Sequence, residues 1–333
     1  MTSGDRIITY SPAFTLVPTY ECFNRCSYCN FRREPGEDQW LDLETARRHL
    51  AQFAAIAYAS HDSQNSVSAY SLIEVLILSG EVHPKSARRG DWLTLIIELC
   101  ELALNCGFLP HTNAGPVSKA EMARLAEVNV SMGLMLEQLT PALLETVHRH
   151  APSKEPELRV QQLVWAGELG IPFTTGLLLG IGETGVDRRQ TLEAIAEIHH
   201  RWGHIQEVIL QPHSPGQRQL FPGQACDADA FLATVELARE ILPENITLQI
   251  PPNLAREPKL LRDCLAAGVT DLGGLVPLDE VNPDYEHHSL EQLQKMLSAW
   301  GYELKPRLPV YPQYIDSLIP RLRDRCRAIQ AVL

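Results

Sequence analysis

Short apolar runs alternate along the chain with longer stretches in which apolar residues recur at helical spacing. This alternation is typical of a parallel α/β fold, in which a helix follows each strand. We expect eight strands, at residues 14–18, 73–78, 108–111, 130–136, 171–179, 207–210, 246–250 and 269–272. We expect helices at residues 43–58, 92–106, 118–128, 141–148, 157–169, 187–202, 227–241, 258–267 and 290–300, and a helical tail at 311–332. Ser118, with Glu121 three residues later, predicts a capping box.

Eight strands with helical crossovers predict a closed (β/α)8 barrel of the TIM type, for which 333 residues are sufficient. A partial (β/α)6 barrel is the alternative. We expect one domain over residues 1–333, with a barrel core at 12–275 and a C-terminal helical extension at 276–333 packed on the barrel. The stretch 60–71 is predicted to be a flexible loop able to cover the open end of the barrel.

The composition narrows the class of protein. Hydrophobic residues make up 45% of the chain, which is enough for a large core. A net charge of −12 argues against nucleic acid or an anionic membrane as the main partner. No apolar run approaches the roughly 20 residues of a membrane span, and the N-terminus lacks a signal-peptide pattern. Eight cysteines are too few for a disulfide scaffold, so we expect a reducing, cytoplasmic setting.

Three cysteines stand close together, at Cys22, Cys26 and Cys29, with the spacing C-x3-C-x2-C. A loop this short can direct three sulfurs at one inorganic centre. A [4Fe–4S] cluster takes a thiolate at each corner iron, so three cysteines would leave one iron open for a ligand that is not protein. A structural zinc site would need a second ligand pair, which the sequence lacks, and a disulfide would leave one cysteine over.

This loop, with Tyr28 before its third cysteine, resembles the cluster loop of the radical S-adenosylmethionine superfamily. The resemblance implies a [4Fe–4S] cluster held by the three cysteines, with S-adenosylmethionine bound to the open iron through its amino and carboxylate groups. One electron would then cleave the cofactor to methionine and a 5′-deoxyadenosyl radical. It also implies a low-potential electron donor such as ferredoxin or flavodoxin.

Two further strings resemble cofactor-binding elements of that superfamily. Ser79-Gly80-Glu81 resembles the G-G-E element that binds the cofactor's ammonium group, with Ser in place of the first Gly. Residues 176–183 resemble the G-x-I-x-G-x-x-E element, with Leu178 in place of Ile, which implies that Gly176, Leu178 and Gly180 contact the adenine. Without this context, the first string is short enough to arise by chance. The second string is equally compatible with a buried strand followed by a glycine turn.

Two single residues complete the expected cofactor site. Glu137 ends the fourth predicted strand, where the superfamily often places a polar residue for the ribose hydroxyls, although a helix-entry acid is the alternative. Tyr28, fixed between two cluster ligands, is expected beside the adenine. Glu183 is expected to shape the turn rather than to contact substrate.

Polar residues at the ends of three other predicted strands, and one on the eighth strand, are candidate substrate contacts. Each of them is equally compatible with a structural role, and no catalytic residue is assigned. They are His111, Asn113, His213, Asn253 and Asp271.

The later strings narrow the resemblance to the family of FO synthase subunit 1. These strings are Gln211-Pro212-His213, residues 250–254, Asp271-Leu272-Gly273-Gly274 and Val281-Asn282-Pro283, with Leu272 where a tryptophan-like residue is expected. The resemblance implies a carbon–nitrogen lyase that makes the deazaflavin FO by radical cyclisation and loss of ammonia. Its substrate would be the tyrosine–ribityldiaminouracil adduct made by FO synthase subunit 2. Alternatives are a radical enzyme similar to subunit 2 or to biotin synthase, or an iron–sulfur protein without catalysis.

Overall fold

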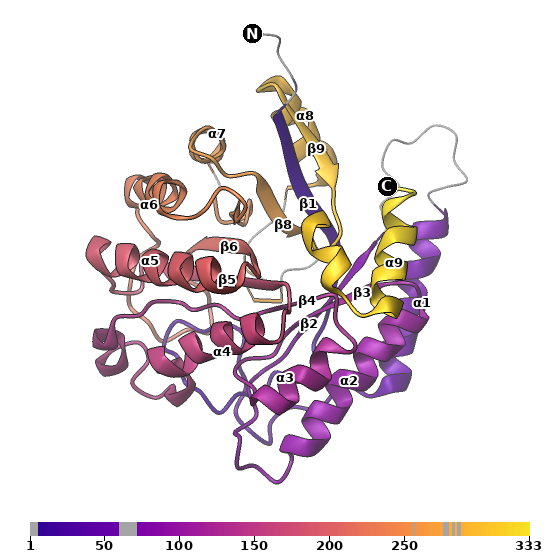
Figure 1. Ribbon diagram of the computed structural model, residues 1–333. Helices are drawn as coiled ribbons and strands as arrows, with labels where there is room; N and C mark the ends of the chain where they lie inside the picture. Colours follow the sequence, from indigo (N-terminus) through magenta and orange to yellow (C-terminus); the bar gives the residue numbers. More distant parts are fainter. Residues whose placement is uncertain (1–5, 60–71, 256, 276–279, 282–283, 285–287) are drawn as a thin grey trace.

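Eight parallel strands close into a barrel in the computed structural model, which describes residues 6–59, 72–255, 257–275, 280–281, 284 and 288–333. Closure is complete because the first strand pairs with both the second and the eighth (Figure 1). The barrel strands are β1 (Arg6–Leu16), β2 (Glu74–Leu78), β3 (Leu109–Asn113), β4 (Ser131–Gly133), β5 (Phe173–Leu179), β6 (Ile205–Pro212), β7 (Thr247–Gln249) and β8 (Asp271–Leu275). The predicted closed barrel is thus confirmed over its six-stranded alternative, whereas the predicted loop at 60–71 lies outside the described residues.

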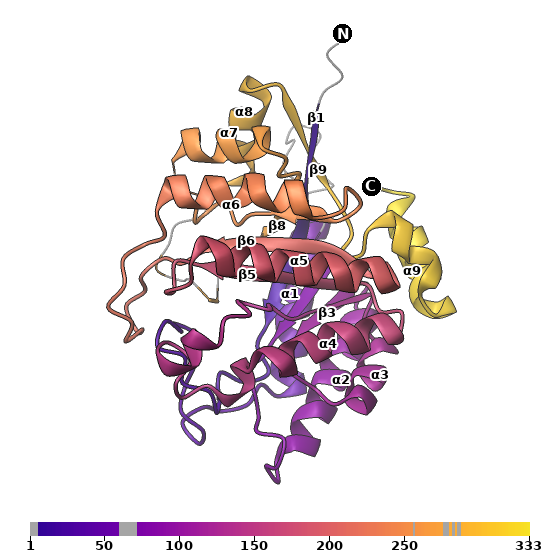
Figure 2. The same cartoon turned by 60° about the vertical axis from the view of Figure 1, so that its left-hand side comes forward.

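Helices surround the barrel and alternate with its strands (Figures 1 and 2). They are α1 (Leu43–Ala59), α2 (Arg89–Asn105), α3 (Lys119–Ala126), α4 (Pro156–Glu168), α5 (Gly185–Trp202), α6 (Ala228–Ile241), α7 (Pro258–Ala266) and α8 (Leu290–Ala299). Helix α3 begins with the predicted capping box, in which Ser118 Oγ accepts from Glu121 N. Among the described helices, none is both long and apolar enough to cross a membrane.

The crossover between β4 and β5 differs from its prediction. Instead of a helix over 141–148 it contains two short 3-10 turns, η1 (Pro141–Glu145) and η2 (Pro152–Lys154). The carbonyl oxygens of Val147 and His150 accept hydrogen bonds from the backbone of the cysteine loop, from Ser27 N at 3.0 Å and Arg25 N at 2.7 Å. These hydrogen bonds hold the crossover against the cysteine loop.

The C-terminal part of the chain contains a strand that the sequence analysis missed. Strand β9 (Tyr302–Pro306) pairs in parallel with Arg6–Tyr10 of β1, so that two strands far apart in the sequence lie side by side (Figure 1). After it come the turn η3 (Pro312–Ser317) and helix α9 (Pro320–Gln330). The expected extension at 276–333 therefore includes a strand as well as helices.

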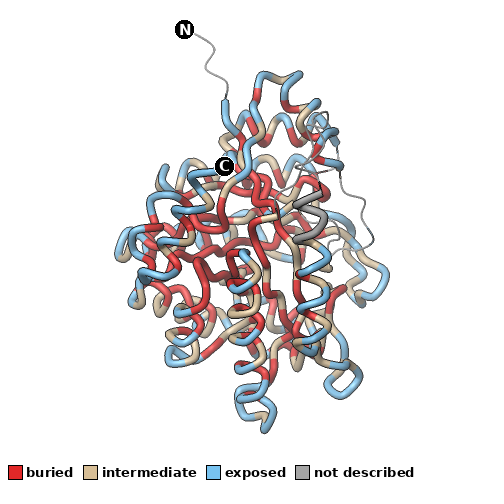
Figure 3. Tube along the Cα trace, turned by 90° about the vertical axis from the view of Figure 1, so that its right-hand side faces the viewer, coloured by how far each residue is buried: buried red, intermediate tan, exposed pale blue. Residues whose placement is uncertain are grey.

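This C-terminal part closes the barrel at the amino-terminal end of its strands. Its buried side chains, among them Leu308, Val310 and Leu322, form a cluster with Ile73 and Leu109 at the amino-terminal ends of β2 and β3. Figure 3 shows the buried trace concentrated in the barrel strands, with exposed segments on the outer helices. The interior is consequently accessible from the carboxyl-terminal end of the strands, where TIM barrels keep their active sites.

Candidate active site

The three cysteines lie on the loop after β1, at the carboxyl-terminal end of the barrel. Cys22, Cys26 and Cys29 are free thiols and line one cavity of about 250 Å³. Ser27 N donates to Val147 O at 3.0 Å, which ties this loop to the crossover after β4. The spacing predicted that the three sulfurs would face a common space, and the structure brings them to one.

The chemistry of these thiols fits an iron–sulfur cluster. Burial raises the pKa of Cys22 to about 11 and that of Cys26 to about 12, so a bound cation is needed to hold them as thiolates at neutral pH. Within the described part of the chain, no three His, Cys, Asp or Glu side chains converge on a single metal ion. A cubane cluster binds each cysteine through a different iron, so the loop fits a cluster better than a structural zinc. The other five cysteines, all described, do not line this cavity.

Glu81 connects the cysteine loop to the crossover after β4. Its Oε2 accepts from Asn24 Nδ2 at 2.8 Å and from Ser153 Oγ, and its Oε1 accepts from Arg159 Nη2 at 3.1 Å. Asn24 Nδ2 also lies 3.7 Å from Cys22 Sγ. The carboxylate therefore orients a side chain that contacts one of the sulfurs, in addition to lining the cavity itself.

The two residues before Glu81 pack backbone against backbone on the segment that leads into the cysteine loop. A methyl group on Gly80 would come within 2.1 Å of Glu21 O, so glycine is required here by packing. Gly80 N donates to Thr19 O at 2.8 Å, and Ser79 Oγ accepts from Trp92 Nε1 at 3.0 Å. Ser79 and Gly80 both line the cavity of the cysteines.

Glu137 lines the same cavity and has a strained backbone. Its φ of 65° makes it the one described residue other than glycine with a positive φ. Lys154 Nζ donates to Glu137 Oε1 at 2.5 Å, and Glu137 N donates to Gly176 O at 3.1 Å. Burial tends to raise the pKa of Glu137, but Lys154 and Arg159 outweigh it, so the pKa is lowered and the group is ionised.

The glycines of β5 allow close packing and a tight turn. A methyl group on Gly176 would lie 2.3 Å from Ile209 O of β6, and Gly180 has a φ of 89°. Leu178, between them, lines the cavity of the cysteines. Glu183 Oε1 accepts from Gly180 N at 2.8 Å, which confirms the prediction that Glu183 shapes this turn.

Tyr28 lines the cavity and has a partner that the sequence analysis missed. Its Oη lies 2.9 Å from His148 Nε2. Burial lowers the pKa of His148 to about 4, so this imidazole is neutral at pH 7. His148 lies between Val147 and His150, whose carbonyls accept hydrogen bonds from the cysteine loop, and no motif in the sequence marks it.

A second cavity of about 220 Å³ lies inside the barrel and adjoins the first. The two share several lining residues, and the shared residues are Leu78, Asn113, Leu134, Met135, Gln211 and Val281. His111, Asn113 and Asn253 line the inner cavity, and His213 lines the cavity of the cysteines, so four of the five candidate substrate contacts face this continuous space. A molecule in the inner cavity would therefore lie beside a cofactor bound near the cysteines.

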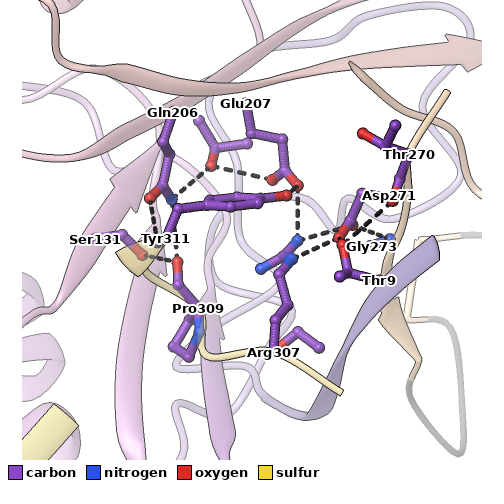
Figure 4. Close-up of polar contacts among 12 residues, drawn as sticks. Thr9, Ser131, Gln206, Glu207, Thr270, Asp271, Gly273, Arg307, Pro309 and Tyr311 are labelled. Atoms are coloured by element: carbon purple, nitrogen blue, oxygen red, sulfur yellow. Dashed lines mark hydrogen bonds and ion pairs between the residues drawn. The ribbon is translucent and has the colours of Figure 1, made fainter. Parts of the chain in front are cut away.

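Asp271 is the candidate that the structure does not bring into either cavity. Its carboxylate is fully buried at the start of β8 and accepts from Arg307 Nε at 2.5 Å, from Gly273 N at 2.6 Å and from Thr9 Oγ1 (Figure 4). Because β8 begins at Asp271, two residues later than predicted, this side chain lies toward the amino-terminal end of the barrel.

Three charged residues that the sequence analysis missed line the inner cavity at its deep end. They are Glu74 on β2, Glu207 on β6 and Arg307 after β9. Arg307 Nη2 donates to Glu207 Oε1 at 2.6 Å and to Asp271 Oδ1 at 2.8 Å, as Figure 4 shows. Each carboxylate lies within an apolar strand, where the sequence pattern alone suggests no function.

The comparisons with known proteins agree with this geometry. Residues 16–195 match the model of the radical SAM superfamily. A 7,8-didemethyl-8-hydroxy-5-deazariboflavin synthase from Synechococcus elongatus is 60% identical over 322 residues, which cover 97% of this chain and 92% of that protein. The enzyme of the same name from Thermosynechococcus vestitus is 60% identical over 326 residues, which cover 98% and 99%.

Two solved structures have a fold similar to that of this chain. The FeFe-hydrogenase maturase HydG from Carboxydothermus hydrogenoformans has a TM-score of 0.72 at 18% identity, covering 99% of this chain and 79% of that one. Methylornithine synthase has a TM-score of 0.64 at 14% identity, covering 91% and 84%. At these identities the likeness supports the fold alone.

Proposed function

Since this chain belongs to the radical SAM superfamily, and within it to the family of 7,8-didemethyl-8-hydroxy-5-deazariboflavin synthases, we propose that it forms the deazaflavin FO from the tyrosine–ribityldiaminouracil adduct. The observation that carries the proposal is the continuity of the two cavities. The three cysteines line one of them, and the other offers a polar, enclosed space directly beside it.

The residues that line the cavity of the cysteines would bind the cofactors. Cys22, Cys26 and Cys29 would hold a [4Fe–4S] cluster. When bound, the cluster and S-adenosylmethionine supply an acceptor strong enough to remove a hydrogen atom from an unactivated C–H group. Ser79, Gly80 and Glu81 would bind the cofactor's ammonium group, and Glu137 its ribose hydroxyls. Gly176, Leu178 and Gly180 would contact the adenine together with Tyr28.

The protein contributes to the reaction by positioning the substrate and by excluding water. A carbon-centred radical reacts with most C–H groups, so the substrate must present one of them and solvent must be held off. Loss of one hydrogen atom from the adduct, ring closure onto the pyrimidine, departure of ammonia, and loss of one proton and one further electron would give the deazaflavin. That second electron would replace the one that the reductant supplied to start turnover. His111, Asn113, His213 and Asn253 would bind the substrate in this space.

The proposed reaction needs two partners. FO synthase subunit 2 would supply the adduct, and a low-potential reductant such as ferredoxin or flavodoxin would supply the electron that starts turnover. Both follow from the chemistry of the substrate and of the cluster rather than from a contact surface.

The test is an anaerobic product assay with the reconstituted protein, dithionite, S-adenosylmethionine and the adduct. We expect 5′-deoxyadenosine, ammonia and the fluorescence of the deazaflavin. Cys22→Ala should lose the cluster's visible absorbance and all products, whereas the control Cys264→Ala, at a buried helical position away from the cavity, should retain both. Formation of 5′-deoxyadenosine without deazaflavin would instead point to another reaction of this superfamily.

A further inference from the structure

The inner cavity has an apolar wall and a polar deep end. On β2 the alternating residues Glu74, Leu76 and Leu78 all line it, with Glu74 deepest and Leu78 next to the cavity of the cysteines. At about 3.3 Å per residue, these four steps span about 13 Å. We call Glu74, His111, Glu207 and Arg307, which line this deep end, the barrel floor.

His111 presents a bare acceptor to the cavity. Ser131 Oγ donates its one hydrogen to Pro309 O at 2.7 Å, and His111 Nδ1 lies 2.6 Å from the same Oγ. Nδ1 must therefore carry the ring proton and donate it, which leaves Nε2 as an acceptor. Burial lowers the pKa of His111 to about 3, so the ring stays neutral, and Nε2 has no donor among the described residues.

The carboxyl groups of the floor add groups that both accept and donate. Ser11 donates to Oε2 of Glu74, and Oε1 has no donor within the described parts of the chain. Glu207 accepts from Arg307 at 2.6 Å, from Tyr311 Oη at 2.8 Å and from Thr174 Oγ1 at 3.2 Å. Burial raises the pKa of Glu74, and it raises that of Glu207 to about 7, so the Glu207 carboxyl group is partly protonated near neutral pH.

We propose that the barrel floor is the binding subsite for a polyhydroxylated chain, the ribityl chain of the adduct. The inference rests on the proposed function, and it places the chain at the end of the cavity farthest from the cofactor. Hydroxyl groups donate and accept at the same atom, as the floor requires, whereas the two rings of the adduct suit the leucines of the wall. The ribityl chain takes no part in the chemistry, so this orientation leaves the reacting carbons beside the cavity of the cysteines.

The side chains of the barrel floor are held in place by contacts from the C-terminal part of the chain. Residues 307–311, here called the C-terminal strap, contribute Arg307 itself, the Pro309 carbonyl that fixes His111 through Ser131, and the Tyr311 hydroxyl on Glu207 (Figure 4). All of them lie outside residues 16–195, which match the superfamily model. Selectivity for the polyol would thus depend in part on a segment that lies outside the residues matched by the superfamily model.

Binding of the product FO to the cluster-containing protein tests the subsite without turnover. The probes are FO, an analogue with a methyl group in place of the ribityl chain, and an analogue with an aminobutyl chain, each followed by its own fluorescence. We expect the wild-type protein to bind FO at least tenfold more tightly than the methyl analogue. His111→Leu and Glu74→Gln should each weaken FO binding about tenfold and leave the methyl analogue unchanged.

His204→Leu is the matched control, because His204 is equally buried but packs between Phe173 and Trp202 and lines neither cavity. It should bind both ligands as the wild type does. Equal binding of FO and the methyl analogue by the wild type would overturn the subsite, and so would equal weakening of both ligands in folded floor variants or tighter binding of the aminobutyl analogue. Selective binding of FO without deazaflavin formation in the product assay would keep the subsite and reject the proposed function.

Discussion

At the scale of single residues, Glu137 combines a strained backbone with a buried ion pair. A left-handed conformation costs a residue with a side chain about 1–2 kcal/mol relative to glycine, and such strain persists where the surroundings or the function require it. Here the strain directs the carboxylate into the cavity and onto Lys154.

Two variants at position 137 separate the energetic effect of the backbone strain from that of losing the carboxylate. Glu137→Gly and Glu137→Ala both leave Lys154 buried without its partner, so each should lose about 3 kcal/mol or more of unfolding free energy. The glycine variant should be the more stable of the two by about 1 kcal/mol, because only it relieves the strain. Urea unfolding of the two proteins measures the difference, and an alanine variant as stable as the glycine variant would contradict it.

The sequence could predict which residues lie together where they are close in sequence, but not where they meet only in the folded barrel. The three cysteines share one loop, so their spacing alone indicates a common centre. Glu74, Glu207 and Arg307 come from distant segments, and only barrel closure brings them together. Asp271 was assigned to the open end because a shift of two residues in a strand start moves a side chain along the barrel.

At the scale of elements, the C-terminal strap, which follows β9, is held to the barrel by the ion pairs of Arg307. Arg307 is buried between Glu207 and Asp271, and no other described cation forms an ion pair with either acid. Removing a buried partner costs more than the pair contributes, because a charge remains without compensation.

Arg307→Met should therefore lower the unfolding free energy by about 3–5 kcal/mol. The double variant Arg307→Met/Asp271→Asn should lose less than the two single variants together, with a coupling energy of about 2 kcal/mol or more. Chemical denaturation of the three proteins gives this cycle. Strict additivity would mean that the contact in Figure 4 contributes no coupling.

The elements that the sequence predicted are those with a long periodic pattern. Strand β9 was missed because its five residues show one buried side chain, Tyr302, and pair along a single edge. In place of the helix expected at 141–148 the chain forms a short 3-10 turn, and the carbonyls that follow it accept hydrogen bonds from the cysteine loop, an interaction that local propensity does not encode. In both cases the segment contacts a partner distant in sequence.

At the scale of the whole molecule, buried histidines make stability depend on pH. Burial lowers the pKa of His111 to about 3 and those of His148 and His204 to about 4, whereas each is about 6.5 in an unfolded chain. Between those values the unfolded state binds the proton and the folded state does not, so stability falls as the pH falls. The raised pKa values of Glu74 and Glu207 act in the opposite direction.

Replacing one of these histidines measures its contribution to the pH dependence of the unfolding free energy. His204→Leu should flatten the decline in unfolding free energy between pH 6.5 and pH 4 by at most about 1.4 kcal/mol per pH unit, because one group with a lowered pKa is removed. Urea denaturation of wild type and variant at several pH values in this range measures the slope. Identical slopes would show that His204 titrates alike in both states.

The pairing of β9 with β1 also sets a constraint on how the protein is made. The ribosome produces β1 first and β9 only after about 300 residues, which takes about 15–60 s at 5–20 residues per second. Until then the nascent barrel holds Glu207 and Asp271 without their guanidinium partner. The floor can therefore be completed only at the end of synthesis, and a chain truncated before residue 302 would carry all eight barrel strands but lack the guanidinium group that pairs with both acids.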